Sequence, residues 1–268
     1  MTCTHCESTG VRRRKQRTAL GYRRFACADC QRRFKERTGM PFNELQFPTD
    51  IVLLAVLWRL RYKLGLRDVA ELLLQRGFDV SYETVRAWEF RFAPLISADL
   101  QMRRHGHGGR SWYLDETYVK VSGRWCYLYR AIDRDDQLLD SMLSEHRDRS
   151  AARRFLRRLV EVSGLRPLRV TTDHHASYPK AIRWICGRGA IHRRDRYLNN
   201  RTEQSHRPLK QRYYPMLEFG NFESASRFCT TFDELHNYFR NEGSMSSVAR
   251  RSLFMSRSRE LIKNVSAA

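Results

Sequence analysis

The chain has 268 residues, of which 50 are Lys or Arg and 29 are Asp or Glu, so its formal net charge is +21. Hydrophobic residues make up 41% and aromatic residues 12%, which excludes a disordered polypeptide, and the length suggests about two domains. The longest apolar run, residues 51–58, is too short to span a membrane. The basic excess favours a polyanionic partner, because each phosphate neutralised by Arg or Lys releases counterions.

Two cysteine pairs mark residues 1–40. Cys3 and Cys6 form one C-x-x-C pair, and Cys27 and Cys30 form the other. Each pair can bind Zn²⁺ from a tight turn, and two pairs complete a tetrahedral thiolate site. A segment this short and polar cannot fold by burying a core, so a structural Zn²⁺ would stabilise it. We therefore predict a zinc ribbon with no open metal position for catalysis.

Residues 45–104 show apolar residues at helical spacing, and a Gly-containing linker follows at 106–109. Helices are expected over 51–62, 66–74 and 82–92, and the last two are joined by a short turn, as in a helix-turn-helix. Tyr82, Arg86 and Arg91 would then face outward toward DNA bases. A three-helix connector without DNA contacts is the alternative.

Residues 110–242 alternate strand-like and helix-like stretches, which predicts an α/β domain. Strands are expected over 112–121, 124–132, 138–143 and 168–172, and helices over 150–162, around Glu203 and over 222–239. Ser122-Gly123 predicts a tight hairpin turn between the first two strands. The long helix at 222–239 would pack on the sheet or form a dimer surface. Residues 243–268 read as a basic tail.

Three acidic residues are candidates for one catalytic centre. Asp115 lies within an apolar strand, where burying a carboxylate is unfavourable unless it has a partner, so a functional role is expected. Asp173 follows a short buried strand, at the end of an α/β sheet where ligands bind. Glu203 lies on a predicted helix, and Lys210 shares its face. If the three carboxylates converge, their hard oxygen atoms suit Mg²⁺ or Mn²⁺.

Other polar residues near these positions have competing interpretations. Glu116 should point to the opposite face of its strand and is expected to be structural. Glu218 is a rival to Glu203, and Asp133 is expected to form a turn. His206 lies one turn after Glu203 and could orient a phosphate or a carboxylate. Lys210 is expected to contact phosphate, with a solvated helix face as the alternative.

Several motifs in combination resemble those of the DDE transposases of bacterial and archaeal insertion sequences. These motifs are Asp115 to Val121, Gly123 to Trp125, Tyr127 to Asp133, Thr172-Asp173, and Leu198 to Arg201 followed by Glu203, Ser205, His206 and Pro208. The most similar family is the IS-six family, and the resemblance covers roughly residues 45–240. The cysteine segment resembles the zinc-ribbon extension that some members carry.

This resemblance implies an RNase-H-like α/β fold with a catalytic triad of Asp115, Asp173 and Glu203. It implies a cytoplasmic, nucleoid-associated prokaryotic enzyme that binds double-stranded DNA and makes cointegrates by 3′-end nicking and strand transfer. Two Mg²⁺ or Mn²⁺ ions would serve the reaction. Joining two element ends requires at least a dimer, and Lys210, His206 and Arg201 would contact DNA. The alternatives are a catalytically decayed DNA-binding regulator and another two-metal nuclease.

Overall fold

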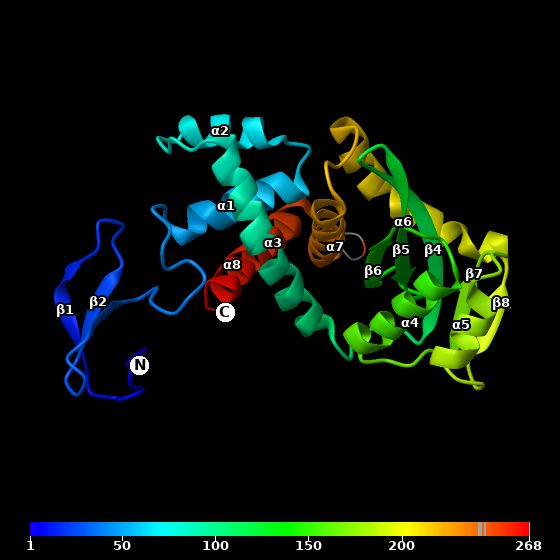
Figure 1. Ribbon diagram of the computed structural model, residues 1–268, viewed down its shortest axis with the longest axis horizontal. Coiled ribbons are helices and arrows are strands. Elements are labelled where there is room, and N and C mark those ends of the chain that lie inside the picture. The colour runs from blue at the N-terminus through cyan, green and yellow to red at the C-terminus, as the bar shows by residue number, and fades with distance from the viewer. Residues whose placement is uncertain (241–242, 244, 268) are drawn as a thin grey trace.

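The computed structural model describes residues 1–240, 243 and 245–267, and the side chains of these except 196–200 and 267. A small sheet, a group of helices and a larger mixed sheet follow one another along the longest axis of the molecule (Figure 1). The middle group combines helices that precede the larger sheet in the chain with helices that follow it, and these share one core.

The N-terminal region is a three-stranded antiparallel sheet in the order β1-β2-β3. Its strands are β1 (Val11–Arg17), β2 (Arg23–Cys27) and β3 (Arg33–Lys35). The stacked rings of Phe25 and Phe34, 5.5 Å apart, form its small core together with Cys3 and Cys27. So few apolar side chains bury little surface, and the region depends on an additional stabilising element.

Three helices occupy the segment in which a helix-turn-helix was predicted: α1 (Thr49–Arg61), α2 (Leu66–Leu74) and α3 (Tyr82–Arg104). Ser81 caps α3 by accepting a hydrogen bond from the Thr84 backbone N–H. Trp88 and Phe92 are buried, as their helical spacing predicted. The helix continues through Pro94 well beyond the predicted end near residue 92. Its later apolar residues, such as Ile96 and Leu100, extend the buried face of the helix.

The large sheet has the strand order β6-β5-β4-β7-β8. Its strands are β4 (Ser111–Val121), β5 (Arg124–Ile132), β6 (Leu138–Ser144), β7 (Arg169–Thr172) and β8 (Ile191–Arg194). The pairs β4–β5 and β5–β6 are antiparallel, whereas β4–β7 and β7–β8 are parallel. This order and these directions define an RNase-H-like sheet, so the predicted fold class is confirmed.

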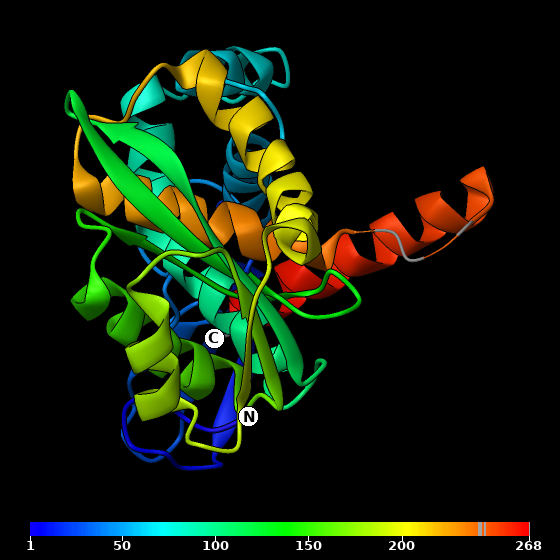
Figure 2. The same cartoon turned by 90° about the vertical axis from the view of Figure 1, so that its right-hand side faces the viewer.

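Helices cover both faces of this sheet. One face carries α4 (Arg149–Ser163) and α5 (Tyr178–Ile185). The other carries α6 (Arg196–Tyr213), the yellow helix in Figure 2, the short 3-10 turn η1 (Tyr214–Met216) and α7 (Phe222–Tyr238). Side chains alternate along β4 between two cores, so Leu114 packs with α4 and α5 while Val119 packs with α7. The second core also includes the apolar faces of α1, α2 and α3.

The C-terminal segment, expected as a basic tail, contains the helix α8 (Ser247–Ala267). Leu261 and Val265 are almost fully buried in the core shared with α1 and α3. The apolar residues of this segment are too sparse to reveal a helix by periodicity, and they become informative only where other helices supply a surface for them. None of the helices in the described part of the chain combines the length and the hydrophobicity that a membrane span requires.

Candidate active site and metal centres

Asp115 and Asp173 lie side by side because β4 and β7 run parallel. Tyr113 pairs with Thr171 in this register, so the two aspartates stand at the same level two residues further on. Oxygen atoms of Asp115, Asp173 and Glu116 all lie within 4.8 Å of one another. Three hard carboxylate oxygens so close together match the ligand preference of Mg²⁺ and Mn²⁺. The sheet thus brings together two of the three predicted catalytic residues.

The carboxylates of this group are crowded. Burial, together with the nearby charge of Asp173, raises the pKa of Asp115 to about 6. Burial also raises the pKa of Glu116, although hydrogen bonding from Tyr178 and the charge of Arg147 act in the opposite direction. Negative charge is therefore unfavourable here without a compensating cation, as expected for a site that binds a metal ion.

His206, on α6, contacts the Asp115 carboxylate. Its Nε2 lies 3.3 Å from Asp115 Oδ2, and its Nδ1 lies 3.4 Å from the guanidinium of Arg130. Burial, with the Arg130 charge, lowers the pKa of His206 to about 3, so the ring is neutral at neutral pH. A guanidinium can only donate, so Nδ1 accepts and the Nε2–H donates to Asp115.

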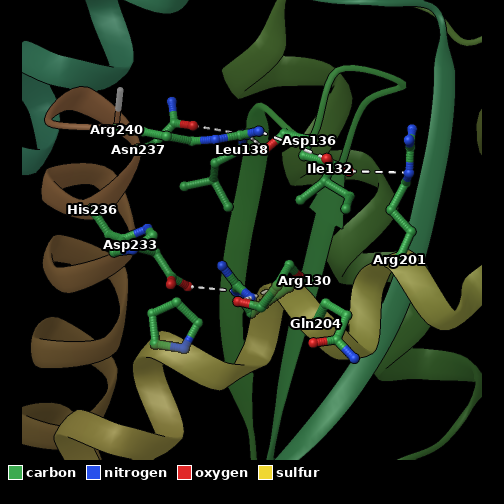
Figure 3. Close-up of a pocket in the computed structure, with 12 residues that line it drawn as sticks. Arg130, Ile132, Asp136, Leu138, Arg201, Gln204, Asp233, His236, Asn237 and Arg240 are labelled. Carbon is green, nitrogen blue, oxygen red and sulfur yellow. Dashed lines mark hydrogen bonds and ion pairs between the residues drawn. The ribbon is translucent and has the colours of Figure 1, made fainter. Parts of the chain in front are cut away.

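Arg130 is itself fixed by the buried Asp233 and by Ser205. Its Nε donates to Asp233 Oδ2 at 3.0 Å, and its terminal nitrogen donates to Ser205 Oγ at 2.9 Å. Figure 3 shows Arg130 reaching from the sheet toward Asp233 on α7. The chain Asp233–Arg130–His206–Asp115 is thereby a continuous polar connection through the interior. His206 contacts the Asp115 carboxylate, one of the two partners predicted for it, and its exposure of only 2% argues against the predicted DNA contact.

Glu203 lies on α6, one turn before His206, and its side chain is exposed. The group of carboxylates formed by the described residues contains Glu116 and not Glu203. Lys210, two turns after Glu203, is half-buried, and its charge acts to lower the pKa of Asp115. Glu218 lies at the hairpin turn, where it accepts a hydrogen bond from the Gly123 N–H at 2.9 Å.

The Glu116 side chain points to the face of β4 opposite to that of Asp115, as strand alternation predicted, and Tyr178 holds it there. The Tyr178 hydroxyl donates to Glu116 Oε1 at 2.5 Å, and Arg147 donates to Glu116 Oε2 at 3.0 Å. β7 ends at Thr172, so no strand separates the Glu116 carboxylate from Asp173. Alternation along one strand therefore placed the side chain correctly but did not reveal that it joins the acidic group.

Sequence reasoning missed Arg130, Arg147 and Tyr178. A signal existed for Arg130: a two-residue turn at Ser122-Gly123 pairs Val121 with Arg124, and counting back along both strands pairs Asp115 with Arg130. No spacing in the sequence marks Arg147 or Tyr178. Asp133 forms a turn, as predicted, and accepts hydrogen bonds from the backbone N–H groups of Asp135 and Gln137.

The four N-terminal cysteines converge on a second candidate metal centre. The sulfur atoms of Cys3 and Cys30 are 3.6 Å apart, as are those of Cys6 and Cys27. Zn–S bonds of about 2.3 Å in a tetrahedron place sulfur atoms about 3.8 Å apart, so this thiolate set fits Zn²⁺. Cys126, Cys186 and Cys229 are buried elsewhere, as expected for small apolar residues.

The residues predicted to contact DNA are distributed over two surfaces. Arg86 and Arg91 are exposed on α3, and Arg86 forms a 2.6 Å ion pair with Glu83. Tyr82 is half-buried, with the Arg86 guanidinium over its ring. Arg201, on α6, forms an ion pair with Asp136 that is drawn in Figure 3. The side chains of 198–200, which precede Arg201 in the motif, lie outside the described residues.

Comparisons with known proteins agree with this architecture. A sequence profile described as "DDE domain", of the IS240 type of transposase, matches residues 109–242, half of the chain. The chain is 38% identical over 175 residues to the transposase for insertion sequence-like element IS431mec of Staphylococcus aureus strain Mu50. This alignment covers 64% of the chain and 77% of that protein. The S. aureus transposase of element IS257 in transposon Tn4003 matches with the same identity and coverage.

Two solved structures resemble part of the chain. The integrase catalytic core domain of HTLV-2, in complex with magnesium, aligns with a TM-score of 0.39 and 15% identity, over 56% of this chain and 99% of that one. A simian T-cell lymphotropic virus intasome, in complex with the PP2A regulatory subunit B56 gamma, aligns with a TM-score of 0.40 and 15% identity, over 54% and 53%.

The DDE domain on an RNase-H-like sheet defines an enzyme that transfers phosphoryl groups on DNA. The match over half of the chain and the identity to the two staphylococcal transposases make the relationship specific. The chain belongs to the DDE transposases of the IS-six family, as its motifs predicted.

Proposed function

We propose that this transposase binds the ends of an insertion sequence, nicks their 3′ ends and joins them to target DNA, producing a cointegrate. The observation that carries the proposal is the adjacency of Asp115 and Asp173 on two parallel strands, within a domain that matches the DDE profile. The alternatives, a decayed regulator and another nuclease, have no comparable support.

Asp115 and Asp173 would hold the divalent metal, with Glu203 as the third carboxylate. Two Mg²⁺ or Mn²⁺ ions, when bound, would activate the attacking oxygen and stabilise the leaving oxygen. The chain's own contribution is orientation: the Nε2–H of His206 fixes one oxygen of Asp115. Lys210 would neutralise a DNA phosphate beside the carboxylates. Zn²⁺ on the four cysteines would fold residues 1–40.

Recognition of double-stranded element ends would fall to α3 and the N-terminal sheet. Arg86, Arg91 and Tyr82 lie on the N-terminal part of α3, where a recognition helix presents residues to the major groove. Arg201 would add a backbone contact. Joining two ends requires at least two copies of the chain, acting on nucleoid DNA in the cytoplasm.

Duplexes carrying the terminal repeats that flank the gene test the proposal. Asp115→Asn is expected to abolish Mg²⁺-dependent nicking while leaving end binding in a gel-shift assay intact. Nicking retained by Asp115→Asn would refute the catalytic assignment. End binding by the wild type without nicking at any Mg²⁺ or Mn²⁺ concentration would favour the decayed regulator.

A second set of variants tests which residue supplies the third carboxylate. Glu203→Gln is expected to lose nicking as completely as Asp115→Asn, whereas Glu218→Gln, at the distant hairpin turn, is expected to retain it. Glu116→Gln keeps the hydrogen bond to Tyr178 and is expected to retain measurable nicking. The reverse result, with Glu203→Gln active and Glu116→Gln inactive, would assign the third ligand to Glu116.

A further inference from the structure

Arg147 lies between two members of the acidic group. It precedes α4 immediately before the capping residue Asp148. One guanidinium nitrogen donates both to Glu116 Oε2 and to Asp173 Oδ2, each at 3.0 Å. A single positive charge therefore bridges two carboxylates whose oxygen atoms, with that of Asp115, lie within 4.8 Å of one another.

The two ends of this bridge differ in strength. The Glu116 side chain is 2% exposed, and its other oxygen accepts from Tyr178, so it is held on both sides. The Asp173 side chain is 31% exposed, and its other oxygen accepts a hydrogen bond from the His175 backbone N–H. An arriving cation can therefore displace Arg147 from Asp173 more easily than from Glu116.

We propose that Arg147 is an internal counter-ion that competes with the divalent metal for Asp173. Without metal, its guanidinium compensates the charge of the acidic group. When metal binds, Arg147 releases Asp173 Oδ2 and stays attached to Glu116, which serves as its anchor. This inference rests on the proposed metal site, and it assigns Glu116 the role of positioning Arg147 rather than of binding metal.

Mn²⁺ titration of the full-length, zinc-loaded protein, followed by calorimetry, tests the competition. Arg147→Gln is expected to bind Mn²⁺ about tenfold more tightly than the wild type, the size expected for losing one competing charge-assisted hydrogen bond. Arg147→Lys retains the charge and is expected to bind within about threefold of the wild type. The control is Arg154→Gln, which changes an exposed arginine on α4 that donates to Ser144 and Ser150 and is expected to match the wild type.

Thermal unfolding without Mn²⁺ gives a readout independent of metal affinity. Arg147→Gln is expected to melt below the wild type without Mn²⁺ and closer to it at saturating Mn²⁺, because the metal replaces the missing charge. If Arg147→Gln does not fold, the double variant Glu116→Gln/Arg147→Gln removes the buried charge and is expected to show the same gain in affinity.

The outcomes separate the two proposals. Equal or weaker Mn²⁺ binding by Arg147→Gln and by the double variant, with normal binding by the wild type, overturns the counter-ion role alone. Binding that is absent from every variant, or that survives in Asp115→Asn, overturns the proposed metal site and the counter-ion role together.

Discussion

Asp115→Asn is expected to stabilise the metal-free protein while abolishing its reaction. The Asp115 carboxyl has a pKa of about 6 in the folded chain, against 3.8 for an ordinary aspartate, because of burial and the Asp173 charge. The difference corresponds to about 3 kcal/mol at 1.36 kcal/mol for each pH unit. Asparagine keeps the shape and can still accept the hydrogen bond from His206, but it carries no charge.

The size of the effect depends on pH. Folding raises the pKa of Asp115, so the protonated carboxyl favours the folded state at low pH. This contribution to stability is fully present below the pKa of the unfolded chain, and it is lost as the pH rises through the pKa of the folded chain. The advantage of Asp115→Asn should therefore be below about 1 kcal/mol at pH 4, grow between pH 4 and 6, and level off near 3 kcal/mol above pH 7.

Urea unfolding of zinc-loaded protein without added Mg²⁺ measures this free energy. The control Asp135→Asn removes an exposed carboxylate and should change stability by less than about 0.5 kcal/mol. Mg²⁺ should stabilise the wild type and not Asp115→Asn. A variant no more stable than the wild type at pH 7.5, or a gain that is equal at pH 4, would refute the reasoning.

Three further predictions concern the other regions. Cys27→Ser, or removal of Zn²⁺ with a chelator, should unfold residues 1–40 while the rest stays folded, which limited proteolysis can detect; protection of this segment in the metal-free protein would contradict a zinc-dependent fold. Arg86→Ala should weaken binding to element ends and lower the salt dependence of the affinity by about one counterion. The control Arg157→Ala changes an exposed residue of α4 and should alter neither quantity. Equal effects of the two variants would argue against recognition by α3. Phe92→Ala should lower the free energy of unfolding, measured in urea, by about 3–5 kcal/mol, because this fully buried ring stacks on another ring at 4.4 Å. Phe90 is 59% exposed, so the control Phe90→Ala should lower the free energy of unfolding far less. Similar losses in the two variants would show that the inward face of α3 is misassigned.

Much of the fold could be predicted because its information is local. Alternation along 112–121 and 124–132, with a Ser-Gly turn between them, predicts a hairpin, and both turn residues adopt the positive φ that such turns require. The helical face of Val85, Trp88 and Phe92 follows from spacing alone. The last helix escaped prediction because the few apolar residues of 247–267 become buried only against helices from distant parts of the chain.

The sequence by itself determined which chemistry is available. Four cysteines at metal spacing, one acid within a predicted strand and another at the end of a predicted strand imply their ligands through residue type and position along the chain. Even the pairing of Asp115 with Arg130 could be counted from the hairpin turn. These features depend on chain geometry, which is the same wherever the motif occurs.

Only the tertiary structure decided which groups share one site. The parallel pairing of β4 with β7 joins Asp115 to Asp173, and the packing of α6 turns His206 inward and leaves Glu203 exposed. Arg147 reaches Asp173 and Glu116 from a loop that no motif marks. Such contacts depend on how helices pack across the sheet, a property of the whole chain that no local spacing encodes.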